Sequence, residues 1–251
     1  MTTFSANLGF LWTDCPLAAA IRAAKAAGFD AVECHWPYDQ PLADVQAALN
    51  ETGLPMLGLN TVRGGEGMFG LCALPNRVED ARQSIDQAIE YGTAIGAGAV
   101  HVMAGKAEGT AADEVFVGNL RYACDKAPDG MTILIEPLNK HDAPGYFLGS
   151  LAKACDVIEA VGHNRLKLMF DCYHVARTEG DVATQLRSHI DMTGHIQFAG
   201  VPDRGEPDRG QVDYAEIFAL IADLGWDWPL GAEYRPSGEP DQTLQWMGTL
   251  R

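Results

Sequence analysis

Several features that would assign a sequence to a common functional class are missing from this chain of 251 residues. Basic side chains are few, since 18 lysines and arginines stand against 34 aspartates and glutamates, for a formal net charge of −16. Nucleic acids and anionic membranes are bound by basic surface, so the composition disfavours both as partners. The acidic excess also has a simpler explanation, because a net negative charge helps to keep many proteins soluble.

The six cysteines include no Cys-x-x-Cys pair and are scattered along the chain. A chain of this length needs no disulfide to fold, and such spacing is typical of buried thiols in a reducing compartment. The first basic residue is Arg22, so the N-terminus lacks the positive segment of a signal peptide. No uncharged stretch is long enough to span a bilayer. We therefore expect a cytoplasmic protein.

Short apolar runs recur along the whole chain, and each is followed by a longer segment of helical character. The eight predicted strands are 4–8, 31–34, 56–60, 99–103, 133–136, 166–171, 195–199 and 230–234. The repeat averages about 31 residues, the usual size of a βα unit. The glycine-rich phosphate turns of open nucleotide-binding sheets are absent. The sequence therefore predicts the α/β class and a single (β/α)8 TIM barrel over residues 1–251.

Helix boundaries are suggested by capping residues between these runs. Asp14 is expected to cap a helix over 17–27 that Gly28 ends, and Thr110 with Asp113 to open another. Apolar residues over 212–224 fall on one helical stripe. These signals predict helices between the strands, as a barrel requires.

Polar residues lie at or near the carboxyl ends of the last four predicted strands. Glu136, Asp171, Gln197 and Glu233 each follow an apolar run. One carboxylate at a strand end can simply accept hydrogen bonds from the next turn, and Gln197 alone can be an ordinary buried amide. Four at the same level of a barrel converge on its mouth, where three carboxylates would repel one another. An oxygen-rich set suits a divalent metal such as Mg²⁺ or Mn²⁺.

At these residues the sequence resembles the hydroxypyruvate isomerase family, a branch of the xylose-isomerase-like barrels. The segments that carry the resemblance are 135–139, 170–174, 195–197, 204–207 and 231–234, with 4–8 and 245–247 at the two ends. The resemblance implies that Glu136, Asp171, Gln197 and Glu233 are the metal ligands and that Glu136 and Glu233 also transfer the proton. Epimerase relatives usually carry histidine at the position of Gln197, which favours the hydroxypyruvate isomerase branch.

The implied substrate is an anion, so an acidic protein needs a local cation to select it. Arg204 is the first candidate and Lys106 the second, while His174 is a candidate to donate a hydrogen bond to a substrate oxygen. Each has an alternative: Arg204 pairs with Asp203 or Glu206, Lys106 points into solvent, and His174 is structural. Glu33 and His35 are ambiguous polar neighbours and are not assigned to the site.

The expected reaction converts hydroxypyruvate to 2-hydroxy-3-oxopropanoate through an enediolate. The loop over 60–70 departs from the wording usual in the family, so substrate length stays open and 2-oxotetronates are an alternative. A ketose 3-epimerase using the same site is a second alternative, and a metal-stabilised barrel that only binds sugar acids is a third. The expected partner is a small oxo acid or sugar-like molecule, and a homo-oligomer is left open.

Overall fold

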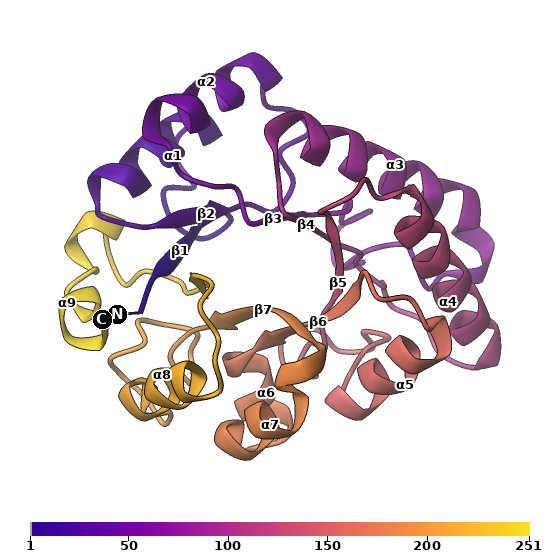
Figure 1. The fold of residues 1–251 in the computed structure, drawn as a ribbon. Helices are drawn as coiled ribbons and strands as arrows, with labels where there is room; N and C mark the ends of the chain where they lie inside the picture. Colours follow the sequence, from indigo (N-terminus) through magenta and orange to yellow (C-terminus); the bar gives the residue numbers. More distant parts are fainter. Residues whose placement is uncertain (1) are drawn as a thin grey trace.

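The computed structural model describes residues 2–251 and shows parallel strands around a central axis with helices outside them (Figure 1). Eight strands follow one another in the order β2-β1-β8-β7-β6-β5-β4-β3. The two edges of this sheet are joined, because Val32 N donates to Pro55 O over 3.0 Å and Leu57 N donates to Val32 O over 2.7 Å. The predicted TIM barrel is confirmed.

Each strand overlaps one predicted run, and no boundary differs by more than two residues. The strands are β1 (Phe4–Asn7), β2 (Ala31–Glu33), β3 (Gly58–Asn60), β4 (Ala99–His101), β5 (Thr132–Ile135), β6 (Leu166–Asp171), β7 (Thr193–Phe198) and β8 (Leu230–Ala232). Their brevity is typical of barrel strands that are covered on both faces.

Helices follow the strands and cover the outside of the barrel (Figure 1). The α-helices are α1 (Leu17–Ala26), α2 (Leu42–Thr52), α3 (Val78–Ile95), α4 (Thr110–Lys126), α5 (Leu151–Val161), α6 (Cys172–Thr178), α7 (Val182–His189), α8 (Tyr214–Asp223) and α9 (Trp246–Leu250). Short 3₁₀ turns occur at η1 (Pro75–Arg77), η2 (Ile190–Met192) and η3 (Pro240–Gln242). Within residues 2–251 no helix is both long enough and apolar enough to cross a membrane.

Two predicted helix starts are wrong. Pro16, and not Asp14, is the N-cap of α1, and this N-cap residue makes no side-chain capping hydrogen bond. Gly109 is the N-cap of α4, which makes Thr110 its first helical residue, and Asp113 forms an ion pair with Lys153 instead of a capping box. The predicted helix over 212–224 is confirmed as α8.

The barrel interior is built in layers, because side chains on a strand alternate between its two faces. Ala99, Leu134 and Met169 form a small buried cluster that is separate from the main core. Two residues further along the same strands, on the same face, lie His101, Glu136 and Asp171. An apolar layer inside the barrel is thus followed by a polar layer at the carboxyl ends of the strands. This alternation sends the polar side chains inward at one end of the barrel.

Candidate active site

The four side chains predicted as metal ligands are all buried at the carboxyl end of the barrel. Asp171 ends β6, Gln197 lies in β7 opposite it, and Glu136 and Glu233 directly follow β5 and β8. Their exposed fractions are 5% for Glu136, 1% for Asp171, 3% for Gln197 and 7% for Glu233. Three carboxylates with so little access to water need compensating charge or hydrogen bonds.

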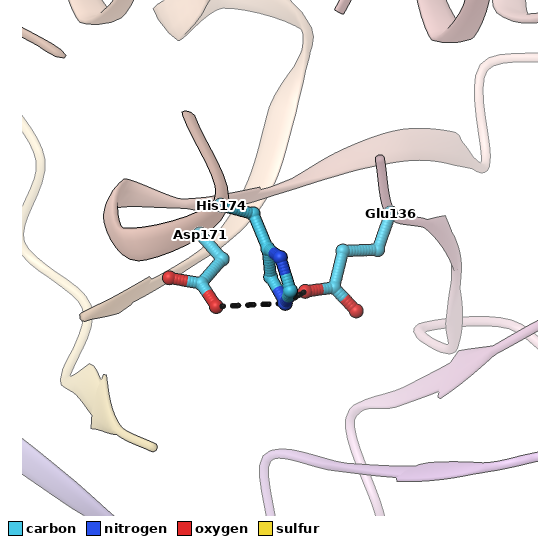
Figure 2. A group of neighbouring side chains, drawn as sticks. All are labelled: Glu136, Asp171 and His174. Carbon is cyan, nitrogen blue, oxygen red and sulfur yellow. Dashed lines mark ion pairs between the residues drawn. The ribbon is translucent and has the colours of Figure 1, made fainter. Parts of the chain in front are cut away.

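Glu136, Asp171 and His174 form a compact group that could hold a metal ion. Each offers one atom, and the three atoms lie within 4.8 Å of one another. Figure 2 shows the ring of His174 between the two carboxylates. Its Nε2 is 3.8 Å from Glu136 Oε1 and 3.6 Å from Asp171 Oδ2. Asp171 also accepts a hydrogen bond from Tyr173 N at 2.7 Å, because it is the N-cap of α6.

The hydrogen bonds of His174 determine which ring nitrogen carries the hydrogen. The backbone N–H of Asn139 donates to His174 Nδ1 over 3.0 Å, so Nδ1 is an acceptor. Burial, with Arg204 adding to it, lowers the pKa of His174 to about 3, so the ring is neutral at pH 7. A neutral imidazole has one N–H, which must then be on Nε2 and face the two carboxylates. His174 is therefore suited to donate a hydrogen bond inside the site and unsuited, in this tautomer, to bind a metal.

Arg204 lies across the carboxylates in the loop between β7 and α8. Its Nη2 donates to Glu233 Oε2 over 2.6 Å and lies 3.4 Å from Asp171 Oδ2. The guanidinium is sandwiched between two rings, 4.8 Å from the centre of Phe10 and 5.0 Å from that of Tyr173. The alternative pairing with Asp203 or Glu206 is not found. Arg204 supplies some of the positive charge that the sequence argument assigned to a metal alone.

This arrangement gives the carboxylates different proton affinities. Burial, together with the nearby Glu233 and Asp171, raises the pKa of Glu136 well above its usual value. Burial also raises the pKa of Asp171 to about 7, although Arg204 acts against it. Burial alone would raise the pKa of Glu233, but Arg204 and His35 hold it at about 2. Without an ion, Glu136 is the carboxylate for which the protein provides the least positive charge.

Two buried oxygen atoms give the site its fit to a cation. Glu136 Oε1 and Gln197 Oε1 have no hydrogen-bond partner among residues 2–251. The Gln197 amide is oriented by its nitrogen, which donates to Glu33 Oε1 over 2.7 Å. Buried polar atoms without partners are rare and often mark a missing water, ion or ligand. With Asp171 and Glu233 nearby, the donors are all oxygen, the set that hard divalent cations prefer.

The second predicted cation, Lys106, lies outside this cluster. It is exposed in the loop after β4, and its Nζ is 5.4 Å from the centre of the Phe69 ring. Arg63 approaches the same ring to 4.8 Å. Gly70 and Gly105 let the two loops cross closely, since a Cβ on Gly105 would be 2.4 Å from Gly70 O. Lys106 and Arg63 therefore both lie against the Phe69 ring instead of contacting the buried carboxylates.

Four further polar residues in this region were not predicted as site residues. His35 Nε2 lies 3.0 Å from Glu233 Oε1, and Asn7 Nδ2 donates to the same oxygen over 3.1 Å. His101 Nδ1 is 3.8 Å from Glu136 Oε2, and Glu33 bonds Gln197. Asn7, Glu33 and His101 are the last residues of β1, β2 and β4. The signal used for β5 to β8, a polar residue at a strand end, would have found them.

Comparison with known proteins places this geometry in a family. The family model for the xylose isomerase-like TIM barrel matches residues 21–250. The 2-oxo-tetronate isomerase of Cupriavidus necator is 40% identical over 254 residues and is covered to 98%, as is this chain. A Danio rerio protein named "Putative hydroxypyruvate isomerase" is 36% identical, with 97% of this chain and 94% of that protein covered.

Solved structures give the same picture of the fold. A crystal structure of an AP endonuclease, family 2, from Brucella melitensis has a TM-score of 0.95, 33% identity and complete coverage of both chains. A D-psicose 3-epimerase from Clostridium cellulolyticum H10 has a TM-score of 0.75 and 17% identity, with 92% of this chain and 84% of that chain covered. The epimerase is similar in fold alone.

Proposed function

Because the chain belongs to the xylose isomerase-like TIM barrel family, we propose that it is a metal-dependent isomerase of a short hydroxy-oxo acid. The observation that carries the proposal is the buried set of oxygen donors at the barrel mouth, in which Glu136 Oε1 and Gln197 Oε1 have no partner among the described residues. Glu136, Asp171, Gln197 and Glu233 would hold one divalent cation, Mg²⁺ or Mn²⁺. When bound, the cation would offset the negative charge that develops on the substrate oxygens during proton transfer.

The reaction moves a carbonyl group between adjacent carbons. One glutamate removes a proton from the hydroxyl-bearing carbon to give an enediolate, and the other returns a proton to the former carbonyl carbon. A second proton passes from the hydroxyl oxygen to the former carbonyl oxygen, so that the two groups exchange carbons. Glu136 and Glu233 are the two candidates, since they follow different strands, β5 and β8, at the same end of the barrel. His174 Nε2–H would donate to a substrate oxygen, and its orientation is fixed by the Asn139 N–H.

The substrate carboxylate needs a cation within an acidic protein, and Arg204 is placed for this role. Its Nε and Nη2 already bond Glu233 and lie near Asp171, while Nη1 makes no hydrogen bond to any residue in the range 2–251. The packing of the guanidinium between Phe10 and Tyr173 fixes the direction in which Nη1 points. We assign hydroxypyruvate as the first substrate to test, with 2-hydroxy-3-oxopropanoate as its product.

A four-carbon 2-oxotetronate is the second candidate. It is supported by the 40% identity to the 2-oxo-tetronate isomerase of Cupriavidus necator over nearly the whole chain. The proposal does not extend to DNA cleavage, despite the AP endonuclease description of the Brucella melitensis structure, because the net charge of −16 disfavours binding to a phosphate backbone.

The test is an isomerase assay after EDTA treatment, with Mg²⁺ or Mn²⁺ restored, on hydroxypyruvate and 2-oxotetronates. We expect activity on at least one acid, its loss with EDTA and its recovery with the ion. A panel of free ketoses is assayed in parallel. Turnover of ketoses alone would replace the proposal with a ketose 3-epimerase, and binding of the acids without turnover would replace it with a binding protein.

A further inference from the structure

A buried carboxylate, Glu33, bonds the amide of the proposed ligand Gln197 and is not used by the proposed reaction. It ends β2 and is 4% exposed. Its Oε2 lies 2.6 Å from His195 Nε2. Its Oε1 accepts from Asn7 Nδ2 over 2.8 Å and from Gln197 Nε2 over 2.7 Å. Glu33 thus connects residues of β1, β2 and β7 through side chains alone.

The hydrogen bond to Glu33 determines which way the Gln197 amide faces. A carboxylate oxygen accepts hydrogen bonds, so the side of Gln197 that faces Glu33 must be its NH₂ group. The carbonyl Oε1 then points away from Glu33, and it is the buried atom that lacks a partner among residues 2–251. If Glu33 were an amide, Gln197 could turn either face toward it. Glu33 therefore selects one of two amide orientations.

Asn7, whose amide is oriented by a backbone N–H, extends the network to Glu233. Its Oδ1 accepts from the backbone N–H of Gly9 over 2.9 Å, which leaves Nδ2 to face the carboxylates. That nitrogen donates to Glu33 Oε1 over 2.8 Å and lies 3.1 Å from Glu233 Oε1. Glu33 consequently contacts one of the proposed ligands, Gln197, directly and is linked to a second, Glu233, through Asn7.

A glycine of β8 leaves the space that the Glu33 side chain occupies. Gly231 of β8 lies opposite Gln197 in the register, and a Cβ there would be 2.8 Å from both Glu33 oxygens and 2.8 Å from Gln197 Cγ. The carboxylate and the Gln197 side chain occupy the volume that any other residue at 231 would fill. The contact between Glu33 and Gln197 thus depends on the absence of a side chain at position 231.

We infer that Glu33 is a positioning residue whose carboxylate turns the Gln197 carbonyl oxygen toward the cation. The inference builds on the ion site of the proposed function. It predicts that altering Glu33 changes the affinity of the protein for the ion. Alteration of residues that orient metal ligands typically changes metal affinity by about 10- to 100-fold.

The experiment measures the dissociation constant of Mn²⁺ for the EDTA-treated full-length protein by calorimetry. We expect Glu33→Gln to weaken Mn²⁺ binding by about 10- to 100-fold. The control is Glu206→Gln, which neutralises another buried carboxylate whose hydrogen-bond partner is Ser237, outside this network. The control should stay within about twofold of the unaltered protein.

A double variant separates orientation from simple structural damage. Glu33→Gln combined with Gln197→Glu exchanges the amide and the carboxylate, so either face of residue 197 presents an oxygen. Mn²⁺ affinity should return to within about threefold of the unaltered protein, a rescue that loss of packing would not produce. If Glu33→Gln does not fold, as judged by circular dichroism, this double variant alone decides the question.

Three results would overturn the inference: Glu33→Gln binding Mn²⁺ within about twofold of the unaltered protein, more than tenfold loss in a folded double variant, or no Mn²⁺ binding by the unaltered protein. The isomerase assay distinguishes this failure from that of the proposed function. An inactive protein that binds Mn²⁺ and loses affinity through Glu33→Gln would disprove the activity and support the positioning role.

Discussion

Arg204 and Glu233 are joined at the barrel mouth by a hydrogen bond of 2.6 Å from Nη2 to Oε2, with 11% and 9% of their side chains exposed. Arg204 also adopts a left-handed backbone conformation, with φ of 60°, which is uncommon for a residue other than glycine. Its carbonyl accepts from Arg235 N over 2.7 Å, so the loops after β7 and β8 are bonded to each other. The protein therefore holds this guanidinium in one place, between Phe10 and Tyr173.

Replacing Arg204 with lysine should reduce substrate recognition although the charge is kept. A lysine lacks the planar group that bonds two partners and stacks between the rings. Hydrogen bonds to charged groups contribute about 1.5–3 kcal/mol, so we expect kcat/KM to fall about 10- to 100-fold, mainly through KM. Steady-state kinetics measure this, with the exposed Arg209→Lys as the matched control. An unchanged KM in Arg204→Lys would remove Arg204 from the binding of the substrate.

The two glutamates proposed to transfer the proton should be separately essential. Glu136→Gln and Glu233→Gln keep the shape of the side chain but cannot accept and return a proton. Positioned acids and bases contribute about 10²- to 10⁴-fold, so kcat should fall at least that far in each variant. Mn²⁺-saturated single-turnover assays measure the step. Glu239→Gln, outside the site, is the control, and a near-normal kcat in either test variant would exclude that residue from proton transfer.

Proton transfer through an enediolate predicts exchange with solvent. In the two-glutamate scheme the returned proton comes from the second glutamate, whose carboxyl proton exchanges with heavy water between turnovers. In heavy water the product should therefore contain deuterium on the carbon that receives the proton, as read by mass spectrometry of partial reactions. Complete retention of the original hydrogen would indicate a direct hydride shift and contradict the two-glutamate scheme.

Glu206 should contribute a pH-dependent part of the folding stability. Its Oε1 accepts from Ser237 N over 2.8 Å and from Ser237 Oγ over 2.7 Å. Burial alone would raise the pKa of Glu206, but these hydrogen bonds lower it below the usual value of 4.5. A lowered pKa in the folded state stabilises the protein above pH 4.5, and this contribution is lost as pH falls through the folded value.

We therefore expect Glu206→Gln to lower the free energy of unfolding by about 1.5 kcal/mol at pH 7, with a difference that narrows as pH falls below 4.5. Urea unfolding at several pH values measures both quantities. The exposed Glu216→Gln is the control. A difference between Glu206→Gln and the unaltered protein that stays constant from pH 7 to pH 3 would show that the charge of Glu206 is not involved.

The strands and the polar residues at their ends could be predicted because both depend on local sequence. A short apolar run that ends in a charge is visible in Ile133-Leu134-Ile135-Glu136, and the barrel then brings such ends together. Helix starts were less predictable. Asp14 and Asp113 are of a residue type that is common in helix caps and capping boxes. The N-cap positions are instead taken by Pro16 and Gly109. Asp113 pairs with Lys153, which is distant in the sequence.

Contacts between distant residues could not be predicted from local patterns. The partner of Arg204 is Glu233, 29 positions away, whereas the sequence offered Asp203 and Glu206 as neighbours. The tautomer of His174 likewise depends on Asn139, 35 positions earlier. Such relationships depend on how the barrel closes. The sequence thus predicts that these polar side chains lie together at one end of the barrel, but it does not predict the hydrogen-bond network that orients them.

The glycine at position 231 makes two sites that are distant in the sequence behave as one. A side chain at position 231 would collide with both the Glu33 carboxylate and Gln197 Cγ, so a larger residue there requires changes at both of these positions. Designed libraries that vary Gly231 alone will therefore place a side chain in volume that is already occupied. Joint variation of Gly231, Glu33 and Gln197 is the practical route to altering this part of the site.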